Sequence, residues 1–341
     1  MKNPRKRLNK IIVHPSFAQT IEEIKNSNMN VFQKPTLVES DFSDRVFPSS
    51  GNIKAIEDKA IYNLDAKNGE EYSRNVFWGG YDESKLNFVA LEGMAFFTSH
   101  SLVLSDKNEY VPVNYLTFYF YTKAKSLADK SAFIKFTDNA VEASNFDYVV
   151  DRAKVLTELD VDNIILFIDG PLVGGNMTSY TIDLVEKLHK KKIIPIFFVK
   201  NSDSNLVTDN IGNLSQRFNS DMHWSHHILK RGQRTRFFLY ADSHNPKNAK
   251  IFCYLKAFDL SPQRIELHTA TYDLCKENVD ALLNLIYYLI LVHGDLKNPQ
   301  IRPIAVAELY ARESLRLIDP FKIFRSIGIV PSMNEIRFGG R

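Results

Sequence analysis

The sequence predicts an α/β fold in which helices flank a mixed sheet. Three predicted strands follow one another within residues 53–122, joined by short connections, which is typical of an antiparallel meander. The second and third of them, 86–99 and 111–122, are rich in Val, Phe, Tyr and Leu. Further along, an apolar run at residues 164–168, an amphipathic stretch at 179–192 and a second apolar run at 193–199 have the order of a parallel βαβ unit.

The individual elements follow from the same periodicities. Residues 1–50 are expected to form an N-terminal arm, with a short amphipathic helix around Ile21 and Ile24 and a loop marked by Pro35, Pro48 and the 49–51 cluster. Residues 51–341 are expected to form one domain. Its strands are predicted at 53–62, 86–99, 111–122, 164–168, 193–199, 236–240, 249–258 and 264–271. Its helices are predicted at 146–159, 179–192, 214–229, 277–293 and 304–317.

The bulk composition sets limits on function. The net charge of +3 does not by itself indicate a nucleic-acid-binding protein, although a local basic groove would be averaged away. Cys253 and Cys275 form no CxxC or zinc pattern, so we expect a reducing, cytoplasmic compartment. No apolar region follows the basic N-terminus, which argues against a secretory signal. The apolar run at 279–292 is shorter than the ~20 residues of a membrane span, so we expect a buried helix and no membrane association.

Asp169 directly follows the buried run at 164–168 and precedes Gly170. In an open α/β sheet, functional sites form at the carboxyl ends of the strands, where such a carboxylate faces the crevice. The alternative interpretation is a turn-forming Asp-Gly pair.

Four other carboxylates are candidates to converge on Asp169. They are Glu57, Asp58, Asp151 and Asp221, and Asp221 could equally be a charge at a helix N-terminus. Carboxylates around one crevice repel each other unless a cation lies among them. Hard oxygen ligands of this kind select Mg²⁺ or Mn²⁺, ions that can activate water and stabilise charge on a phosphate.

Two further polar features accompany these acids. Lys200 ends the strand next to that of Asp169, where it could contact phosphate or simply be solvated. His223, His226 and His227 include an i, i+4 pair but no HExxH motif, which favours a partly exposed polar helix face over a zinc site.

The succession of these features resembles the NurA nuclease family. That family has a strand ending in Val-Asp-Gly-Ser, an acid on a helix, a strand ending in Asp-Gly-Ser/Pro-Leu and a strand ending in Lys. A Ser-Asp helix start and a Tyr-Pro…Ala-His pattern on a C-terminal helix come after these. The counterparts here are, in order, Ala55-Ile56-Glu57-Asp58, Asp151, Asp169-Gly170-Pro171-Leu172, Lys200, Ser220-Asp221 and Arg302-Pro303 to Leu309-Tyr310.

The resemblance implies a ribonuclease H-like core and a set of site residues. It implies metal ligands at Asp169, Asp151 and either Glu57 or Asp58. It also implies assisting roles for Asp221 and Tyr310, and phosphate contacts from Lys200 and Arg302. Three positions depart from the family pattern: Glu57-Asp58 replaces Asp-Gly, Asp151 replaces a Glu, and Tyr310 and Arg302 replace the family His and Tyr.

The resemblance further implies a DNA nuclease dependent on Mn²⁺ or Mg²⁺, acting as a homodimer with HerA, a hexameric DNA-translocating ATPase, in DNA end processing, repair or anti-phage defence. The chain has no GxxxxGK[ST] segment, so the motor would be a separate protein. The altered residues keep a non-catalytic adaptor that binds DNA or the ATPase open as an alternative, and an RNA-cutting enzyme as a third. The apolar residues of the N-terminal segment could dock the partner or pack on their own domain. They are Ile11, Ile12, Val13, Phe17, Ile21 and Ile24.

Overall fold

The computed structural model describes residues 15–26, 45–46, 51–106, 109–128, 134–158, 160–173, 178–210, 214–293 and 299–333. The chain divides into two compact units, residues 1–38 and 39–341, which are described separately.

Helix α1 (Pro15–Asn26) is the described part of the first unit. It forms where the spacing of Ile21 and Ile24 predicts a helix, and both side chains are exposed. Residues 11–13, the side chain of Phe17 and the expected loop residues Pro35 and 48–50 lie outside the described residues.

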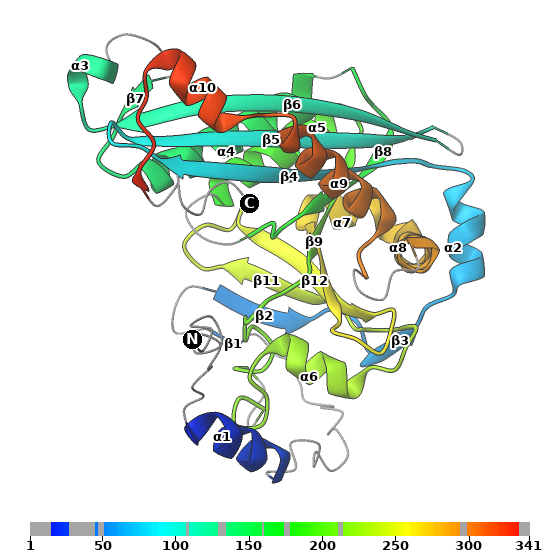
Figure 1. The fold of residues 1–341 in the computed structure, drawn as a ribbon. Coiled ribbons are helices and arrows are strands. Elements are labelled where there is room, and N and C mark those ends of the chain that lie inside the picture. The colour runs from blue at the N-terminus through cyan, green and yellow to red at the C-terminus, as the bar shows by residue number, and fades with distance from the viewer. Residues whose placement is uncertain are drawn as a thin grey trace, which may run out of the picture. The chain divides into compact units, whose positions relative to one another are not determined.

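The described strands of the second unit join in one mixed sheet. They are β1 (Arg45–Val46), β2 (Gly51–Ala55), β3 (Ile61–Asn63), β4 (Phe77–Val89), β5 (Met94–Asp106), β6 (Glu109–Thr122), β7 (Ile134–Phe136), β8 (Ile164–Asp169), β9 (Ile194–Val199), β10 (Gln233–Thr235), β11 (Phe238–Asp242), β12 (Ala249–Lys256) and β13 (Gln263–His268). The main order is β1-β2-β11-β12-β13-β9-β8-β4-β5-β6-β7, and β10 pairs with β3 and β12 beside it. This arrangement confirms the predicted α/β class with a mixed sheet (Figure 1).

Helices flank this sheet on both faces. They are α2 (Ala66–Ser73), α3 (Lys125–Ala128), α4 (Ala140–Glu158), α5 (Thr178–Lys190), α6 (Asp221–Ile228), α7 (Thr269–Cys275), α8 (Val279–His293), α9 (Arg302–Arg316) and α10 (Pro320–Ile327), with a 3₁₀ turn at Lys276–Asn278. Of these, α4 and α5 cover one face of the central strands, and α8 and α9 cover the other. No helix of the described ranges is both long and apolar enough to cross a membrane.

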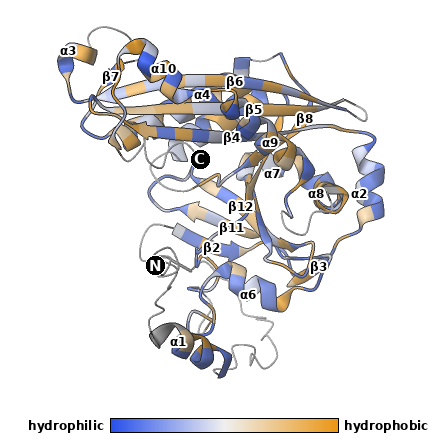
Figure 2. Ribbon diagram, viewed as in Figure 1, coloured by the Kyte–Doolittle hydropathy of each residue, from blue (hydrophilic) through white to orange (hydrophobic). Residues whose placement is uncertain are grey.

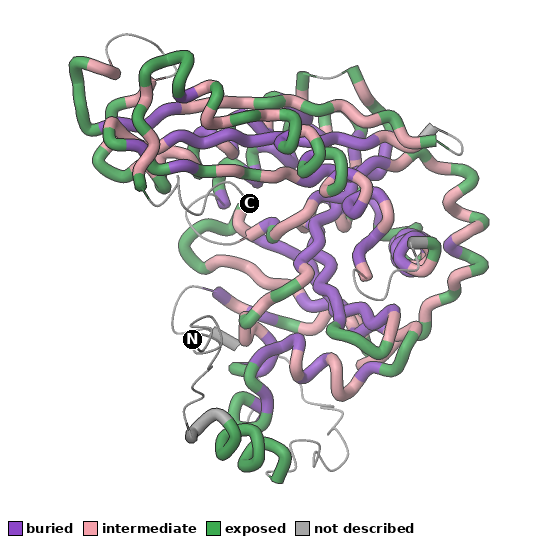
Figure 3. The backbone as a smooth tube through the Cα atoms, in the orientation of Figure 1, coloured by how far each residue is buried: buried purple, intermediate pink, exposed green. Residues whose placement is uncertain are grey.

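Strands β4, β5 and β6 form an antiparallel meander. The sequence predicts a meander, but from the segments 53–62, 86–99 and 111–122. The first of these lies outside it, and most of β4 was not predicted. The side chains of the three strands alternate between the two faces of the sheet. Near the far end of the meander, Phe88, Phe97 and Phe118 pack against Phe324 of α10 on the face that α9 also covers. Figure 3 shows the middle strand, β5, as largely buried, whereas β4 and β6 also carry intermediate and exposed residues.

Strand β8 lies at the centre of the fold, parallel to β4 on one side and to β9 on the other. Ile165 and Phe167 face the core beneath α8, whereas Leu166 and Ile168 face the core beneath α5. All four side chains are buried, which confirms the prediction of a strand covered on both faces. Replacing Phe167 with Ala would cost about 3–5 kcal/mol of folding free energy.

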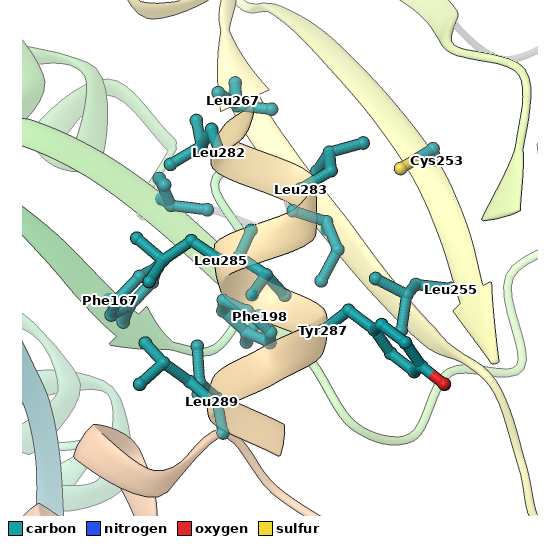
Figure 4. Packing of buried hydrophobic residues seen from close by; sticks show 14 of the residues in the cluster. Phe167, Phe198, Cys253, Leu255, Leu267, Leu282, Leu283, Leu285, Tyr287 and Leu289 are labelled. Carbon is teal, nitrogen blue, oxygen red and sulfur yellow. The ribbon is translucent and has the colours of Figure 1, made fainter. Parts of the chain in front are cut away.

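Helix α8 supplies the largest apolar surface of the core, as expected for the run at 279–292. Leu282, Leu285 and Leu289 follow helical spacing toward the strands that carry Phe167 and Phe198 (Figure 4). The helix is largely hydrophobic, whereas α2, which packs against it, is largely hydrophilic (Figure 2).

Several predicted boundaries are wrong for identifiable reasons. The strand predicted at 86–99 is a hairpin, because a turn at 90–93 separates β4 from β5 and apolar residues on both sides conceal it. The strand predicted at 53–62 ends at Ala55, since residues 57–60 bend before β3. The helix predicted at 214–229 begins only at Asp221, where the Ser220 hydroxyl accepts a hydrogen bond from the His223 backbone N–H.

Candidate active site

Four charged side chains meet on the face of the sheet that α9 covers. The Lys200 ammonium lies 3.0 Å from an Asp169 carboxylate oxygen, 3.7 Å from Glu308 and 3.9 Å from Asp82. We call these four residues the carboxylate–lysine cluster. Asp82 lies on β4, Asp169 ends β8, Lys200 follows β9, and Glu308 lies on α9.

The parallel register of β4, β8 and β9 explains why the first three members meet. Tyr81 pairs with Ile168, so the next residue of each strand, Asp82 and Asp169, stands at the same level of the sheet. Asp169 in turn pairs with Phe198, two residues before Lys200. Beyond Asp169 the chain turns away at Gly170, whose φ of 98° is one that residues with a side chain rarely adopt.

Alternation along β4 separates Asp82 from its neighbour Glu83. Asp82 faces α9, whereas the Glu83 carboxylate is buried on the opposite face, where Tyr148 and Arg152 of α4 interact with it. Glu83 therefore belongs to the packing of α4 and not to the carboxylate–lysine cluster.

Helix α9 brings Glu308 to the sheet because Gly80 leaves room for it. A Cβ at Gly80 would lie 2.3 Å from the Pro303 carbonyl carbon and 2.4 Å from its oxygen, and neither backbone atom can move cheaply. Glu308 is then held by hydrogen bonds from Gln300 and from Arg312, the latter an i, i+4 pair on α9.

The cluster carries more negative than positive charge. Burial, followed by the charge of Asp169, raises the pKa of Asp82 to about 8. Burial also raises the pKa of Asp169, although Lys200 opposes this shift. Burial alone would lower the pKa of Lys200, but its carboxylate neighbours outweigh burial and raise it. The carboxylates therefore keep the Lys200 ammonium charged. The pKa of Asp169 stays raised because this one positive charge only partly offsets the effect of burial.

The donor chemistry of the cluster fits a hard divalent cation. It offers carboxylate oxygens of the type that Mg²⁺ and Mn²⁺ prefer, and its surplus negative charge is what a cation would neutralise. As they stand, no three His, Cys, Asp or Glu side chains in the described ranges are grouped to hold a metal ion, since the carboxylates share the Lys200 ammonium instead.

A buried ionic network supports the loops on either side of the cluster. Glu266 of β13 is fully buried and accepts hydrogen bonds from Lys250 at 2.6 Å and from the Leu172 backbone N–H at 2.8 Å. The Arg264 Nε lies 2.7 Å from Glu266, and the same guanidinium donates to the hydroxyl of Ser202 at 3.0 Å. One network thus anchors both the turn after Asp169 and the loop after Lys200.

The structure does not bring Glu57 or Asp58 to Asp169, so the prediction that either joins it is wrong. Four strands separate β2, which precedes them, from β8. Glu57 instead accepts two hydrogen bonds from the guanidinium of the buried Arg234, at 2.8 and 2.9 Å, and one from the Phe237 backbone N–H. Asp58 is exposed at the adjoining turn.

Asp151 and Asp221 are also placed elsewhere. Asp151 is a buried residue of α4, on the face of the meander opposite α9, and accepts hydrogen bonds from Tyr119 at 3.0 and 3.1 Å. Asp221 is fully buried and accepts from the backbone of Val207 and Thr208 and from the Tyr254 hydroxyl. These hydrogen bonds hold the 201–210 loop in place and occupy the Asp221 carboxylate, so it does not take part in the cluster.

Of the remaining candidates, Lys200 reaches Asp169, whereas Tyr310 and Arg302 do not. Tyr310 is partly exposed and, two residues after Glu308, points to the other side of α9. Arg302 lies at the start of α9, where its guanidinium is 5.4 Å from the Tyr110 ring centroid.

The histidines of α6 contact one another. The Nε2 atoms of His223 and His227 are 3.2 Å apart, and both rings lie against Phe218. Among the described residues they belong to no group of three His, Cys, Asp or Glu side chains, and the preference for a polar helix face over a zinc site stays a prediction.

Asp82 and Glu308 are the members that sequence reasoning missed, and both had a signal. Tyr81-Asp82-Glu83-Ser84 matches the Val-Asp-Gly-Ser pattern at its Asp and Ser, better than the segment at Glu57 does. In Ala307-Glu308, the acid directly follows an alanine, as the family histidine does. Asp82 was missed because the first strand was placed too early in the sequence. Glu308 was missed because the position of the family histidine was placed two residues too late.

Comparison with known proteins agrees with this architecture. The NurA domain model matches residues 121–312, more than half of the chain, and this segment contains Asp169, Lys200 and Glu308. The crystal structure of the NurA nuclease from Sulfolobus solfataricus superposes with a TM-score of 0.54 at 9% identity, covering 92% of this chain and 98% of that one. A second crystal structure of NurA gives a TM-score of 0.46 at 8% identity, over 90% and 95%. No curated protein matches the sequence.

Proposed function

Because the chain belongs to the NurA family, we propose that the carboxylate–lysine cluster is the active site of a metal-dependent DNA nuclease. The observation that supports this most directly is the juxtaposition of Asp82 and Asp169 on adjacent parallel strands, with Lys200 and Glu308 facing them. Carboxylates held together at a buried or half-buried position are costly to folding, and such costs are characteristic of functional sites.

The residues divide into two roles in this proposal. Asp82, Asp169 and Glu308 would hold Mn²⁺ or Mg²⁺, and a cation bound there supplies an activated water and neutralises charge on the scissile phosphate. Lys200 contacts a phosphate oxygen through its ammonium, which the surrounding carboxylates keep charged and oriented. Glu266 and its cationic partners hold the turn after Asp169 in place.

The test is cleavage of linear duplex DNA in Mn²⁺ buffer with and without chelator. We expect chelator-sensitive cleavage by the wild type and a loss of at least about 100-fold in Asp169→Ala with DNA binding retained, since only the site is altered. Asp58→Ala is the matched control, because this exposed carboxylate lies outside the cluster and its variant should cut normally. Undiminished cleavage by Asp169→Ala would refute the assignment, and single-stranded DNA and RNA substrates separate it from an RNA-cutting enzyme.

The adaptor alternative loses its original motivation. It depended on the residues at Glu57, Arg302 and Tyr310, and none of the three belongs to the carboxylate–lysine cluster. The cluster itself retains acidic residues at three positions.

We propose in addition that the enzyme acts as a homodimer with a HerA-type hexameric ATPase, in DNA end processing or anti-phage defence. The family membership supports this proposal, together with the lack of any nucleotide-binding GxxxxGK[ST] segment in this sequence. Co-purification with the ATPase, followed by measurement of the mass of the complex in solution, tests it. A monomer that neither binds the ATPase nor cuts faster in its presence would contradict it.

A further inference from the structure

A cavity of about 820 Å³ opens on the same sheet face as the carboxylate–lysine cluster, and its lining includes Trp78, four residues before Asp82 on β4. Its lining residues come from α2, the start of β4, the adjoining ends of β5 and β6, the C-terminal part of α8 and the first turn of α9. Figure 1 shows how these elements are arranged. Its volume is in the range of pockets that bind small organic groups.

Aromatic side chains form one wall of this cavity. Trp78, Ser105 and Tyr110 occupy neighbouring strands in one row, since Ser105 pairs with Tyr110 and its hydroxyl donates to the Trp78 carbonyl at 2.7 Å. The rings of Trp78 and Tyr110 have centroids 5.8 Å apart and planes inclined by 58°. Tyr288 of α8 adds a third aromatic ring to the lining.

Polar groups of both signs complete the lining. The Arg302 guanidinium lies over the Tyr110 ring, 5.4 Å from its centroid. Arg74 is paired with Glu70 at 2.7 Å, and Glu109 is exposed at the rim. Aromatic faces with an arginine can stack a flat heterocycle and contact its phosphate, while carboxylates can accept from exocyclic amino groups.

The cavity lies within reach of a strand bound at the cluster. Trp78 and Asp82 share one face of β4 and are separated by about 13 Å along the strand. Arg302 and Glu308 are separated by about 9 Å along α9. A stacked nucleic-acid strand advances roughly 3.4 Å per nucleotide, so these spans correspond to roughly three or four nucleotides.

We infer that this cavity is a nucleobase subsite, in which Trp78 and Tyr110 stack a base of the substrate strand a few nucleotides from the scissile phosphate and Arg302 contacts its backbone. The inference rests on the proposed nuclease function for the identity of the ligand. It assigns to Arg302 a phosphate contact away from the cluster.

Binding measured in chelator tests the subsite without requiring cleavage. The probe is a labelled single-stranded DNA 12-mer, followed by fluorescence anisotropy. We expect Trp78→Ala and Tyr110→Leu each to weaken binding about 5- to 100-fold, the effect of losing one base–aromatic stack. Tyr180→Ala, which truncates a partly exposed ring on α5, is the matched control and should bind as the wild type does. Arg302→Gln should weaken binding and lower the slope of log affinity against log salt by about one.

A series of 12-mers with a single abasic site locates the base. We expect one position to lose affinity in the wild type and the same position to be silent in Trp78→Ala. Trp78 and Trp224 are the only tryptophans, so a Trp224→Phe protein reports stacking on Trp78 directly through quenching of its fluorescence. If Trp78→Ala does not fold, the affinity of Tyr110→Leu and the quenching of Trp78 fluorescence test the subsite instead.

Unchanged affinity in folded Trp78→Ala and Tyr110→Leu would overturn the subsite, and so would equal losses along the abasic series. Quenching by free deoxynucleoside monophosphate with a flat abasic series would show a separate nucleotide site and would also overturn it. A protein that shows the abasic signature but does not cut DNA would refute the nuclease and leave the subsite standing.

Discussion

Asn in place of Asp82 is expected to stabilise the metal-free protein while removing its activity. Asp82 has a folded-state pKa of about 8, against an ordinary value of 3.8. Each pKa unit of difference corresponds to about 1.4 kcal/mol. At pH 7 the raised pKa of Asp82 therefore lowers the free energy of unfolding by at most about 4 kcal/mol. Asn has nearly the same shape and does not titrate. We therefore expect Asp82→Asn to raise the free energy of unfolding by about 1–4 kcal/mol at pH 7.

The pH dependence has a definite sign. Because the folded-state pKa is raised, the folded state holds a proton that the unfolded state releases above about pH 4. The wild type therefore matches Asp82→Asn below pH 4, loses stability relative to it as the pH rises, and reaches the full difference near pH 8.

Urea unfolding in chelator at pH 5 and pH 8 measures this difference, with Asp58→Asn as the matched control at an exposed site. Cleavage assays on the same preparations should show a loss of at least about 100-fold in Asp82→Asn and none in the control. A variant less stable than the wild type at pH 8, or a difference equal at both pH values, would refute the electrostatic argument.

Three other predictions follow from the corrected site. Asp151→Asn removes a carboxylate that accepts from Tyr119, so cleavage should stay within about threefold of the wild type in initial-rate assays; a loss of about 100-fold would return Asp151 to the site. Glu266→Gln leaves two buried cations poorly compensated and should cost about 3–5 kcal/mol in urea unfolding, with an unchanged midpoint contradicting the network. Arg234→Met removes the partner of Glu57, and we expect a similar destabilisation with the cleavage rate of the folded fraction preserved.

Much of the fold could be predicted because local patterns determine it. The run at 164–168 is too short for a helix and too apolar for a half-buried strand, so its position between two helical layers follows from composition alone. The hairpin at β4 and β5 could not be resolved in this way. Its turn holds Leu91, Glu92 and Gly93 between apolar strands, and hydrophobic content alone does not mark such a turn.

The site was harder to predict because its members meet through tertiary packing. Asp169 and Lys200 end adjacent strands, and the βαβ pattern is enough to bring them together. The choice between Asp82 and Glu57 depends on which strand pairs with β8, and both segments carry an acid after apolar residues. Glu308 depends on the close approach of α9 at Gly80, a long-range contact that no local pattern encodes.

The arrival of Glu308 on α9 also has a consequence for biosynthesis. The cluster draws its members from positions 82 to 308, so a nascent chain can build the meander and β8 well before it can complete the catalytic constellation. The contact between Glu308 and the strands that carry the other members forms late and slowly, because residues far apart in the sequence meet only after much of the chain is ordered. Chains released early by a stop codon before α9 would therefore carry an incomplete site. The topology thus limits the hazard that half-made copies of a nuclease would pose to the cell that translates them.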